Sequence, residues 1–338
     1  MTDHTRMSDI HHDPVLTKVG IDYRSPALIW PDIAPMVGVE ERSAYYPIFG
    51  REHMRLPDTS RRESGGGART VEFGVSKTTF TCEKHALNTF LLRDLMNAAN
   101  VVTKEQFRQR AVQVVMGMLQ MEHENNVRAL FMTEASFATG YYLDIDGIAD
   151  RRWDETSGDP FGDMTTGISA VQTGTNCLED EIVVIIPKAV WNELRHDSDL
   201  LDRIKYTQRG SMTPDILAAL LGVRKVLIGG AVYQSARPGL AEVPAALWTD
   251  KHVAIIYAPE NPGQVASGSV LGALAAANTF KWNNLPDSIE GLELISWIDE
   301  SKDMTEWIEL QWAIDMKPTH VNSSDELTGA YLIENVYD

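Results

Sequence analysis

The sequence predicts a mixed α+β protein, and three stretches of the chain carry that prediction. Residues 181–236 have the pattern of a strand, two helices and a second strand. A helical pattern of about 30 residues begins at Thr103, and residues 292–336 alternate as β-strands do. Helices and strands are thus interleaved in the middle of the chain, while strands dominate its end. That order is typical of an α+β architecture.

The central stretch, residues 181–236, contains the clearest elements. Ile182–Ile186 is a β-branched run of the buried-strand type, and a second such strand is predicted at 226–230. Thr213 is a good N-cap for a helix that Gly222 is placed to end. An earlier helix is predicted from apolar residues at helical spacing, namely Trp191, Leu194, Leu201 and Ile204.

The helical pattern that begins at Thr103 is the longest in the chain. Thr103 and Gln106 fit a capping box, and a helix over 103–133 would span about 45 Å at 1.5 Å per residue. We therefore expect a structural spine. The predicted buried face comprises Phe107, Ala111, Val114, Val115, Met118 and Met121, and the predicted opposite face comprises Gln109, Gln113, Gln120 and Glu124.

Extended or turn conformations are predicted for the first 40 or so residues, and two strands for residues 43–88. Frequent prolines exclude a long helix from residues 1–42, and apolar groups such as Trp30 favour an arm that docks on another surface over a disordered leader. Residues 43–88 have the pattern of two strands joined by a polar, glycine-rich tip at 56–68. Because an isolated two-stranded ribbon is marginally stable, this hairpin is expected to lie against something else, such as another subunit.

The composition narrows the function classes. The 338 residues are 43% hydrophobic, and the formal net charge is −18. The first 100 residues hold 12 basic and 13 acidic side chains, which leaves 18 basic and 35 acidic in the remainder. Such acidity disfavours a protein that binds nucleic acid by affinity. No run of about 20 apolar residues predicts a membrane span, and no secretory signal is apparent, so we expect a soluble protein.

No convergent chemistry is predicted. Cys82 and Cys177 are far apart in sequence and have no zinc-ligand spacing. His196 and Asp197 could support acid–base chemistry, but a solvated helix face explains them more simply. The cluster at residues 11–13, His-His-Asp, lacks a rigid further ligand and is interpreted as a surface cluster. We therefore expect no catalytic residue, no cofactor and no metal.

The chain resembles the major capsid proteins of tailed bacteriophages with the Hong Kong 97-type fold. The similarity to the axial-domain core of these shells is carried by VVIIPKAVWNELRHDSDLLDRIKYT, followed by TPDILAALLGVRKVLIGGAVYQSA. The ascending limb of their extended loop is similar to YPIFGREHMRLPDTSRR. The order of arm, hairpin, spine helix, α/β core and β-rich end also follows the family's plan.

The resemblance implies five parts, each with a place in a shell. They are an N-terminal arm (1–42), an extended hairpin loop reaching over a neighbouring subunit (43–88), a peripheral domain with a spine helix at 103–133 (89–180), an α/β axial domain around the hexamer and pentamer centres (181–288), and a β-rich return to the peripheral domain (289–338).

The implied function is structural. A member of this family would self-assemble into hexamers and pentamers of an icosahedral head, enclose double-stranded DNA without reading its sequence, and reside in the virion after assembly in the host cytoplasm. Its other partners would be a separate scaffolding protein, a portal and decoration proteins, with no membrane. The expected inter-subunit contact residues are Arg51, Arg55, Arg61, Arg62 and Trp30.

Two alternatives stay open at this point. A bacterial encapsulin-type nanocompartment shell would share the fold but enclose enzymes, and an α/β enzyme would use His196 and the loops at the strand ends. Some phage relatives form an isopeptide bond between a lysine and an asparagine. The hairpin contains Lys77 and Lys84, but no partner asparagine is matched by motif, so this cross-link is not predicted.

Deleting Asp58 to Gly67 should leave the isolated subunit folded, because this polar segment adds nothing to a core, while impairing assembly. Circular dichroism and sedimentation of the variant would check both expectations. Unfolding of the isolated subunit would mean that the hairpin tip packs within its own chain.

Overall fold

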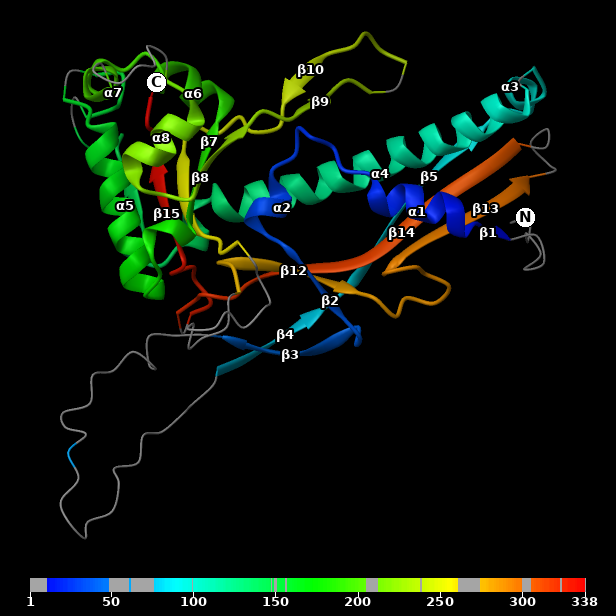
Figure 1. Ribbon diagram of the computed structural model, residues 1–338, viewed down its shortest axis with the longest axis horizontal. Helices are drawn as coiled ribbons and strands as arrows, with labels where there is room; N and C mark the ends of the chain where they lie inside the picture. Colours follow the sequence, from blue (N-terminus) through cyan, green and yellow to red (C-terminus); the bar gives the residue numbers. More distant parts are fainter. Residues whose placement is uncertain are drawn as a thin grey trace. The chain divides into compact units, whose positions relative to one another are not determined.

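The computed structural model describes residues 11–48, 61, 76–98, 100–146, 148, 151–155, 157–204, 212–237, 239–260, 274–299, 305–322 and 324–337 (Figure 1). The chain forms two compact units, and each contains segments from distant parts of the sequence. Unit 1 comprises Met1–Ala44, Phe80–Ala129 and Thr279–Lys317, and unit 2 comprises Tyr45–Thr79, Leu130–Asn278 and Pro318–Asp338.

Unit 1 is built on a six-stranded sheet. Its order is β1-β13-β14-β12-β2, with β5 also pairing with β14. The bounds are β1 (His11–His12), β2 (Met36–Val39), β5 (Glu83–Leu91), β12 (Ala277–Trp282), β13 (Leu292–Asp299) and β14 (Thr305–Pro318). Strand β14 runs antiparallel to β13 and to β5, whereas β12 and β2 are parallel.

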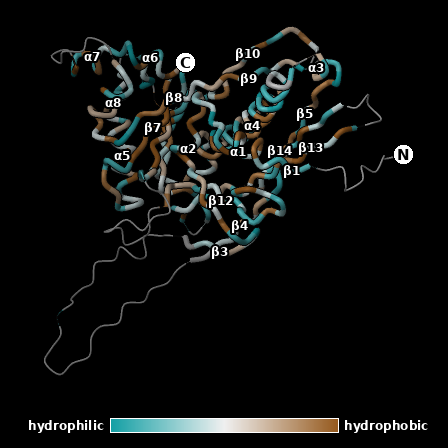
Figure 2. Tube along the Cα trace, turned by 45° about the vertical axis from the view of Figure 1, so that its right-hand side comes forward, coloured by the Kyte–Doolittle hydropathy of each residue, from teal (hydrophilic) through white to brown (hydrophobic). Residues whose placement is uncertain are grey.

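Alternation along β14 explains which face of this sheet is buried. Ile308, Leu310, Trp312 and Ile314 are all buried, as their spacing of two predicts. They form one core with apolar residues of β13 and of two helices, α1 (Pro14–Asp22) and α4 (Val101–Phe131). Figure 2 shows the mixed hydropathy of these elements along their length. A further helix, α3 (Arg93–Ala98), contributes Met96 to the same core.

The spine helix exists, but it begins earlier than predicted. Helix α4 has 31 residues and starts at Val101, not at Thr103. The backbone N–H of Thr103 donates to Oδ1 of Asn100 at 2.9 Å, and the backbone N–H of Lys104 donates to the Asn100 carbonyl at 2.9 Å. Asn100 is therefore the capping residue, and the expected capping box at Thr103 is wrong.

The predicted buried face of α4 is also wrong in part. Val114 and Met118, expected inside, are 42% and 56% exposed. Gln120 and Glu124, expected on the solvent side, are buried. The buried residues of the helix are Val112, Val115, Met116, Leu119, Gln120, His123, Glu124, Val127 and Phe131.

The N-terminal arm explains why polar residues of α4 are buried. Both carboxylate oxygens of Glu124 accept the backbone N–H of Ile29 at 3.2 Å, and Oε2 also accepts that of Trp30 at 2.7 Å. These are the first N–H groups of the short helix α2 (Trp30–Ile33), which has no side-chain cap of its own. The Gln120 amide donates to the Tyr23 carbonyl at 2.8 Å. The arm is thus held on α4 by hydrogen bonds to its backbone.

Unit 2 is built on a five-stranded sheet. Its order is β6-β15-β11-β7-β8, in which β7 and β8 are parallel, β11 is antiparallel to β7 and β15, and β15 and β6 are parallel. The bounds are β6 (Tyr142–Asp144), β7 (Ile182–Pro187), β8 (Lys225–Gly229), β11 (Val253–Tyr257) and β15 (Ala330–Glu334). Every residue of β7, β11 and β15 is buried, which explains why these strands are apolar apart from Glu334 at the end of β15.

Four helices accompany this sheet, namely α5 (Pro160–Thr175), α6 (Lys188–Leu194), α7 (Ser198–Ile204) and α8 (Pro214–Leu221). Helix α5 packs on β15 and β11, and α8 packs on β8. The predicted start and end of α8 are confirmed, because Thr213 Oγ1 accepts the Ile216 N–H at 3.4 Å and Gly222 has a φ of 74°. Two short 3-10 helices lie at Glu134–Ser136 and Glu179–Glu181.

The structure differs from the predicted organisation of residues 181–236 and of the chain's end. The first of the two helices expected between the strands, which was predicted to run through Trp191 and Ile204, is two helices, α6 and α7, with Leu200 buried in place of Leu201. The predicted β-rich return, 289–338, supplies strands to two sheets, because β15 pairs with β11 of unit 2. Residues 130–180, expected with the spine helix, also fall in unit 2.

Two small ribbons complete the described elements. Strands β3 (Ser43–Ile48) and β4 (Ser76–Thr81) pair, as expected for the base of the long hairpin, and Ser43 Oγ donates to the Phe80 carbonyl at 2.9 Å. The predicted tip at 56–68 lies outside the described residues apart from Arg61. Strands β9 (Val232–Gln234) and β10 (Pro244–Ala246) form the other ribbon.

Replacing Glu124 by alanine should lower the free energy of unfolding by about 3 kcal/mol, because it leaves two buried backbone N–H groups without an acceptor. Urea denaturation of unassembled subunits would measure the loss. The matched control is Glu122→Ala on the same helix, where the carboxylate is half exposed, and it should change stability by less than about 0.5 kcal/mol. Equal losses in the two variants would contradict this role of Glu124.

Candidate functional sites

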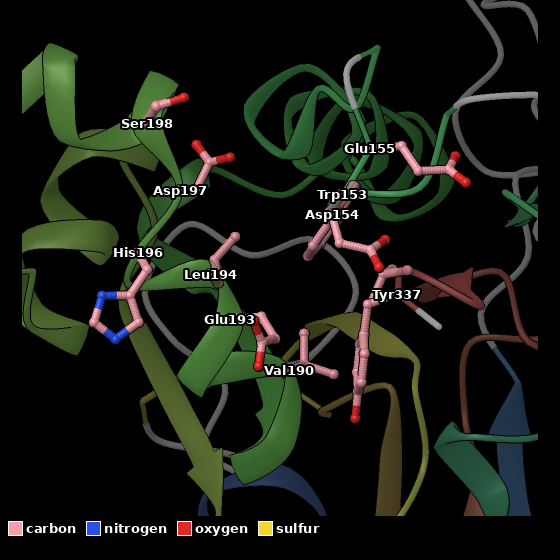
Figure 3. A pocket seen from close by; sticks show the side chains of 11 residues that line it. Trp153, Asp154, Glu155, Val190, Glu193, Leu194, His196, Asp197, Ser198 and Tyr337 are labelled. Carbon is pink, nitrogen blue, oxygen red and sulfur yellow. The ribbon is translucent and has the colours of Figure 1, made fainter.

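A pocket of about 320 Å³ lies in unit 2 beside helix α6 (Figure 3). Its wall is acidic and partly aromatic, and one side is formed by the C-terminal segment. The lining residues that carry polar or aromatic groups are Trp153, Asp154, Glu155, Glu193, His196, Asp197, Ser198 and Tyr337.

Hydrogen bonds hold the aromatic side of the pocket in place. The Trp153 indole N–H donates to Oδ2 of Asp163 on α5 at 3.0 Å, and its backbone N–H donates to the Val336 carbonyl at 2.7 Å. Arg151 pairs with the other oxygen of Asp163. Burial raises the pKa of Tyr337, and the nearby Glu193 carboxylate adds to that rise. The Nζ atom of Lys251 lies 5.4 Å from the centroid of the Tyr337 ring.

The structure places His196 and Asp197 in the turn between α6 and α7, not on a solvated helix face as predicted. The chain leaves α6 here, and Oδ1 of Asp197 accepts the Leu200 N–H at 2.9 Å, which caps α7. Figure 3 shows the His196 ring and the Asp197 carboxylate pointing in different directions. Within the described residues, no hydrogen bond joins these two side chains, so Asp197 has a structural role and does not orient the imidazole.

The histidine cluster at the N-terminus separates in the structure. His11 and His12 form β1 on the edge of the unit 1 sheet, paired with Ser296 and Ile295. Asp13 caps α1, since its Oδ1 accepts the N–H groups of Val15 and Leu16. The three residues therefore do not converge on one point. Among the described residues, one other group could hold a metal ion: His12, Asp287 and Glu293.

The ribbon of β9 and β10 exposes apolar side chains that its own unit does not cover. Leu240, in the loop between the two strands, is 68% exposed, and neither strand has a buried residue. The strands are held by their backbone pairing and by Gln234, whose Oε1 accepts the Val243 N–H at 2.6 Å. The exposed apolar residues of this ribbon are Val232, Tyr233, Leu240 and Val243. Exposed apolar side chains grouped on one element are typical of interaction surfaces.

A second apolar surface lies on the outer face of the unit 1 sheet. Phe90, Trp307 and Trp297 come from neighbouring strands and stand in one row. The ring centroids of Phe90 and Trp307 are 5.3 Å apart, and those of Trp307 and Trp297 are 6.1 Å apart. Phe90 is half exposed. This row faces away from the core that α1 and α4 cover.

Two of the five predicted inter-subunit residues lie in the described part of the chain. Arg51, Arg55 and Arg62 lie outside the described residues, and Arg61 is exposed. Trp30 packs edge-on against His123, with ring centroids 4.9 Å apart, and is 8% exposed. An inter-subunit role for Trp30 stays a prediction, and little of its side chain remains exposed for one.

Two histidines among the described residues are buried, one in each unit. Burial, with a smaller contribution from His85, lowers the pKa of His123 to about 4. The Nε2 atom of His123 lies 3.0 Å from Thr279 Oγ1. Burial also lowers the pKa of His320 to about 4, and the ring meets Tyr257 edge-on. Both imidazoles are therefore neutral near pH 7. Sequence reasoning did not single them out, because a histidine within an apolar pattern gives no separate signal.

Comparison with known proteins identifies relatives across most of the chain. A curated major capsid protein from Burkholderia phage BcepMu is 25% identical over 252 residues, which cover 74% of this chain and 78% of that protein. The chain is a homologue of a phage major capsid protein. No family model matches the sequence.

Comparison with solved structures shows that the present chain has the Hong Kong 97-type fold of tailed-phage capsid proteins. A phage-related protein from Bordetella bronchiseptica is 19% identical, with a TM-score of 0.72 over 96% of this chain and 97% of its own. The capsid of cyanophage P-SCSP1u is 13% identical, with a TM-score of 0.55 over 91% of this chain and 88% of its own. The predicted α+β fold class is confirmed.

In the part of the chain that the structure describes, no helix combines the length and apolar character that crossing a bilayer requires.

Replacing His123 or His320 by glutamine should reduce the loss of stability at acid pH. In the unfolded chain each histidine becomes protonated near pH 6.5, whereas in the folded chain both stay neutral down to about pH 4. The free energy of unfolding therefore falls as pH is lowered through this window, by up to about 3 kcal/mol for each histidine. Urea denaturation of wild type and variants at pH 7, 5.5 and 4.5 would measure this fall in the free energy of unfolding.

The comparison must be made between variant and wild type at each pH, because Glu334 acts in the opposite direction. Burial raises the pKa of Glu334 to about 7, with Glu134 and Asp144 adding to the rise, so its contribution to stability is lost as pH rises. A difference between variant and wild type that does not change with pH would contradict the roles of the two histidines.

Proposed function

We propose that the protein is the structural subunit of a phage head, which self-assembles through hexamers and pentamers into an icosahedral shell around double-stranded DNA. The observation that carries this proposal is the match to a curated major capsid protein over most of both chains. That relative is a phage protein, which favours a phage head over a bacterial nanocompartment. The turn at His196 offers no catalytic pair that would favour an enzyme.

The two units suit the two domains of such a subunit. Unit 2, with its buried strands and covering helices, would be the axial domain around the capsomer centre. Unit 1, with the long helix α4 and the extended sheet, would be the peripheral domain. The hairpin that begins with β3 and β4 would reach over a neighbouring subunit, where Arg51, Arg55, Arg61 and Arg62 would make contacts.

The ribbon of β9 and β10 would bind a second copy of the chain. Isolated two-stranded ribbons are marginally stable in water, and this one has no buried side chain within its own unit. Covering its apolar residues on assembly would contribute about 25 cal/mol of favourable free energy per Å² of apolar surface removed from water. In a homo-oligomer a second copy of the chain would cover these apolar residues, so no other kind of protein would be needed.

The net charge fits a container more than a nucleic-acid binder. At −18 the protein as a whole repels phosphates, so packaged DNA would be confined by the shell and not bound to it. An acidic lining would limit adhesion when the DNA leaves. Portal, scaffolding and decoration proteins would be its other partners, and the virion its final location, reached from the host cytoplasm.

The proposal is tested by negative-stain microscopy and sedimentation of the overexpressed protein and by analysis of the source particle. Closed shells of uniform size, or the chain as the main component of the particle, are the expected results. A strictly monomeric protein that is absent from the particle would refute the proposal.

Replacing Val232 and Leu240 together by serine should reduce shell yield by at least about tenfold, while the stability of the unassembled subunit changes by less than about 0.5 kcal/mol, because both side chains are exposed there. Sedimentation velocity measures the yield, and urea denaturation measures the stability. Glu242→Ser, on the same loop, is the matched control. Wild-type yields from the double variant would show that the ribbon is not an assembly contact.

A further inference from the structure

Three side chains from two distant parts of the sequence converge on the edge of the unit 1 sheet. They are His12 of β1, Asp287 of the turn between β12 and β13, and Glu293 of β13. One ligand atom from each lies within 4.8 Å of the other two. One imidazole nitrogen and two carboxylate oxygens are a donor set that suits a divalent metal ion.

The strand register explains how His12 and Glu293 share one face. His12 pairs with Ile295, which lies two residues after Glu293 and therefore has its side chain on the same side of the sheet. This is the outer face, since Leu292 and Leu294, on the other side, are in the core. The neighbouring His11 pairs with Ser296 and has its side chain on the face opposite to that of His12.

A cross-strand partner orients the Glu293 carboxylate. Gln311 lies directly opposite on β14, and its Nε2 donates a hydrogen bond to Oε2 of Glu293. Glu293 is only 6% exposed, and its second oxygen remains able to accept a metal ion. Hydrogen bonds of this kind to a ligating carboxylate hold it in place for an ion.

Within the described residues, the carboxylates near this point form no ion pair. Glu309, on the same face of β14, has its pKa raised by burial and by the charge of Glu293. None of the ion pairs found in the described ranges involves Glu293, Glu309 or Asp287. A bound divalent cation would neutralise this charge.

We propose that His12, Asp287 and Glu293 form a binding site for a divalent transition-metal ion of the Zn²⁺ class. The imidazole favours such an ion over Ca²⁺ or Mg²⁺, which prefer oxygen ligands alone. Donor atoms around one tetrahedral Zn²⁺ lie about 3.4 Å apart, so small side-chain rotations would close the site. Water would complete the coordination.

The site would fasten the N-terminal segment to the sheet. Strand β1 has only two residues, and two backbone pairs hold it to β13. A metal bond from His12 to Asp287 and Glu293 would add a link that depends on the ion.

The test is a titration of the full-length protein with ZnCl₂, followed by isothermal calorimetry and by the melting temperature. The wild type is expected to bind with a stoichiometry that falls by one site in His12→Ala, or to lose at least about tenfold in affinity at that site. Asp287→Asn should behave in the same way. Both residues are exposed, so neither substitution should prevent folding.

His11→Ala is the matched control, since it removes an exposed histidine from the same strand but from the opposite face. It should bind Zn²⁺ as the wild type does. Equal losses in His11→Ala and His12→Ala, unchanged binding in His12→Ala, or binding of CaCl₂ in place of ZnCl₂ would each overturn the proposal.

Discussion

The buried carboxylate of Glu124 is the constraint on which the arrangement of unit 1 depends. A charge removed from water is costly unless hydrogen bonds replace its hydration, and here the N–H groups of Ile29 and Trp30 do so. The same bonds satisfy the uncapped start of α2. The Glu124 carboxylate of α4 therefore gains hydrogen-bond donors from the arm, and the backbone N–H groups of the arm gain an acceptor from α4. Docking of the arm is specific for this reason, since apolar contact alone would tolerate a shift along the helix.

This pairing also shows where sequence patterns stop being informative. The hydrophobic pattern found the existence, length and approximate position of α4, because those depend on local residues. It assigned the wrong face at its C-terminal half, because Gln120 and Glu124 are polar yet buried. What buries them is a segment nearly a hundred residues earlier in the chain. Only a tertiary contact, which a local pattern does not contain, reveals that face.

Other differences have equally physical causes. Thr103 and Asn100 are both good caps, and the choice between them depends on how the preceding chain enters the helix. The pattern across residues 188–204 did not reveal the break at Asp197, since an N-cap aspartate also fits a solvated helix surface. The candidate metal site was missed because one ligand precedes the other two by most of the chain. The buried strands of unit 2, by contrast, were found readily, because complete burial leaves an unmistakable apolar run.

The interleaving of the two units has a consequence for biosynthesis. The chain passes between the units five times, and neither unit is a continuous segment. Strand β15, near the end of the sequence, occupies the place between β6 and β11 inside the sheet of unit 2. The sheet of unit 2 therefore cannot form completely until β15 has left the ribosome. A prematurely terminated chain would therefore lack a complete sheet in unit 2 and would leave the apolar faces of β6 and β11 exposed to aggregation.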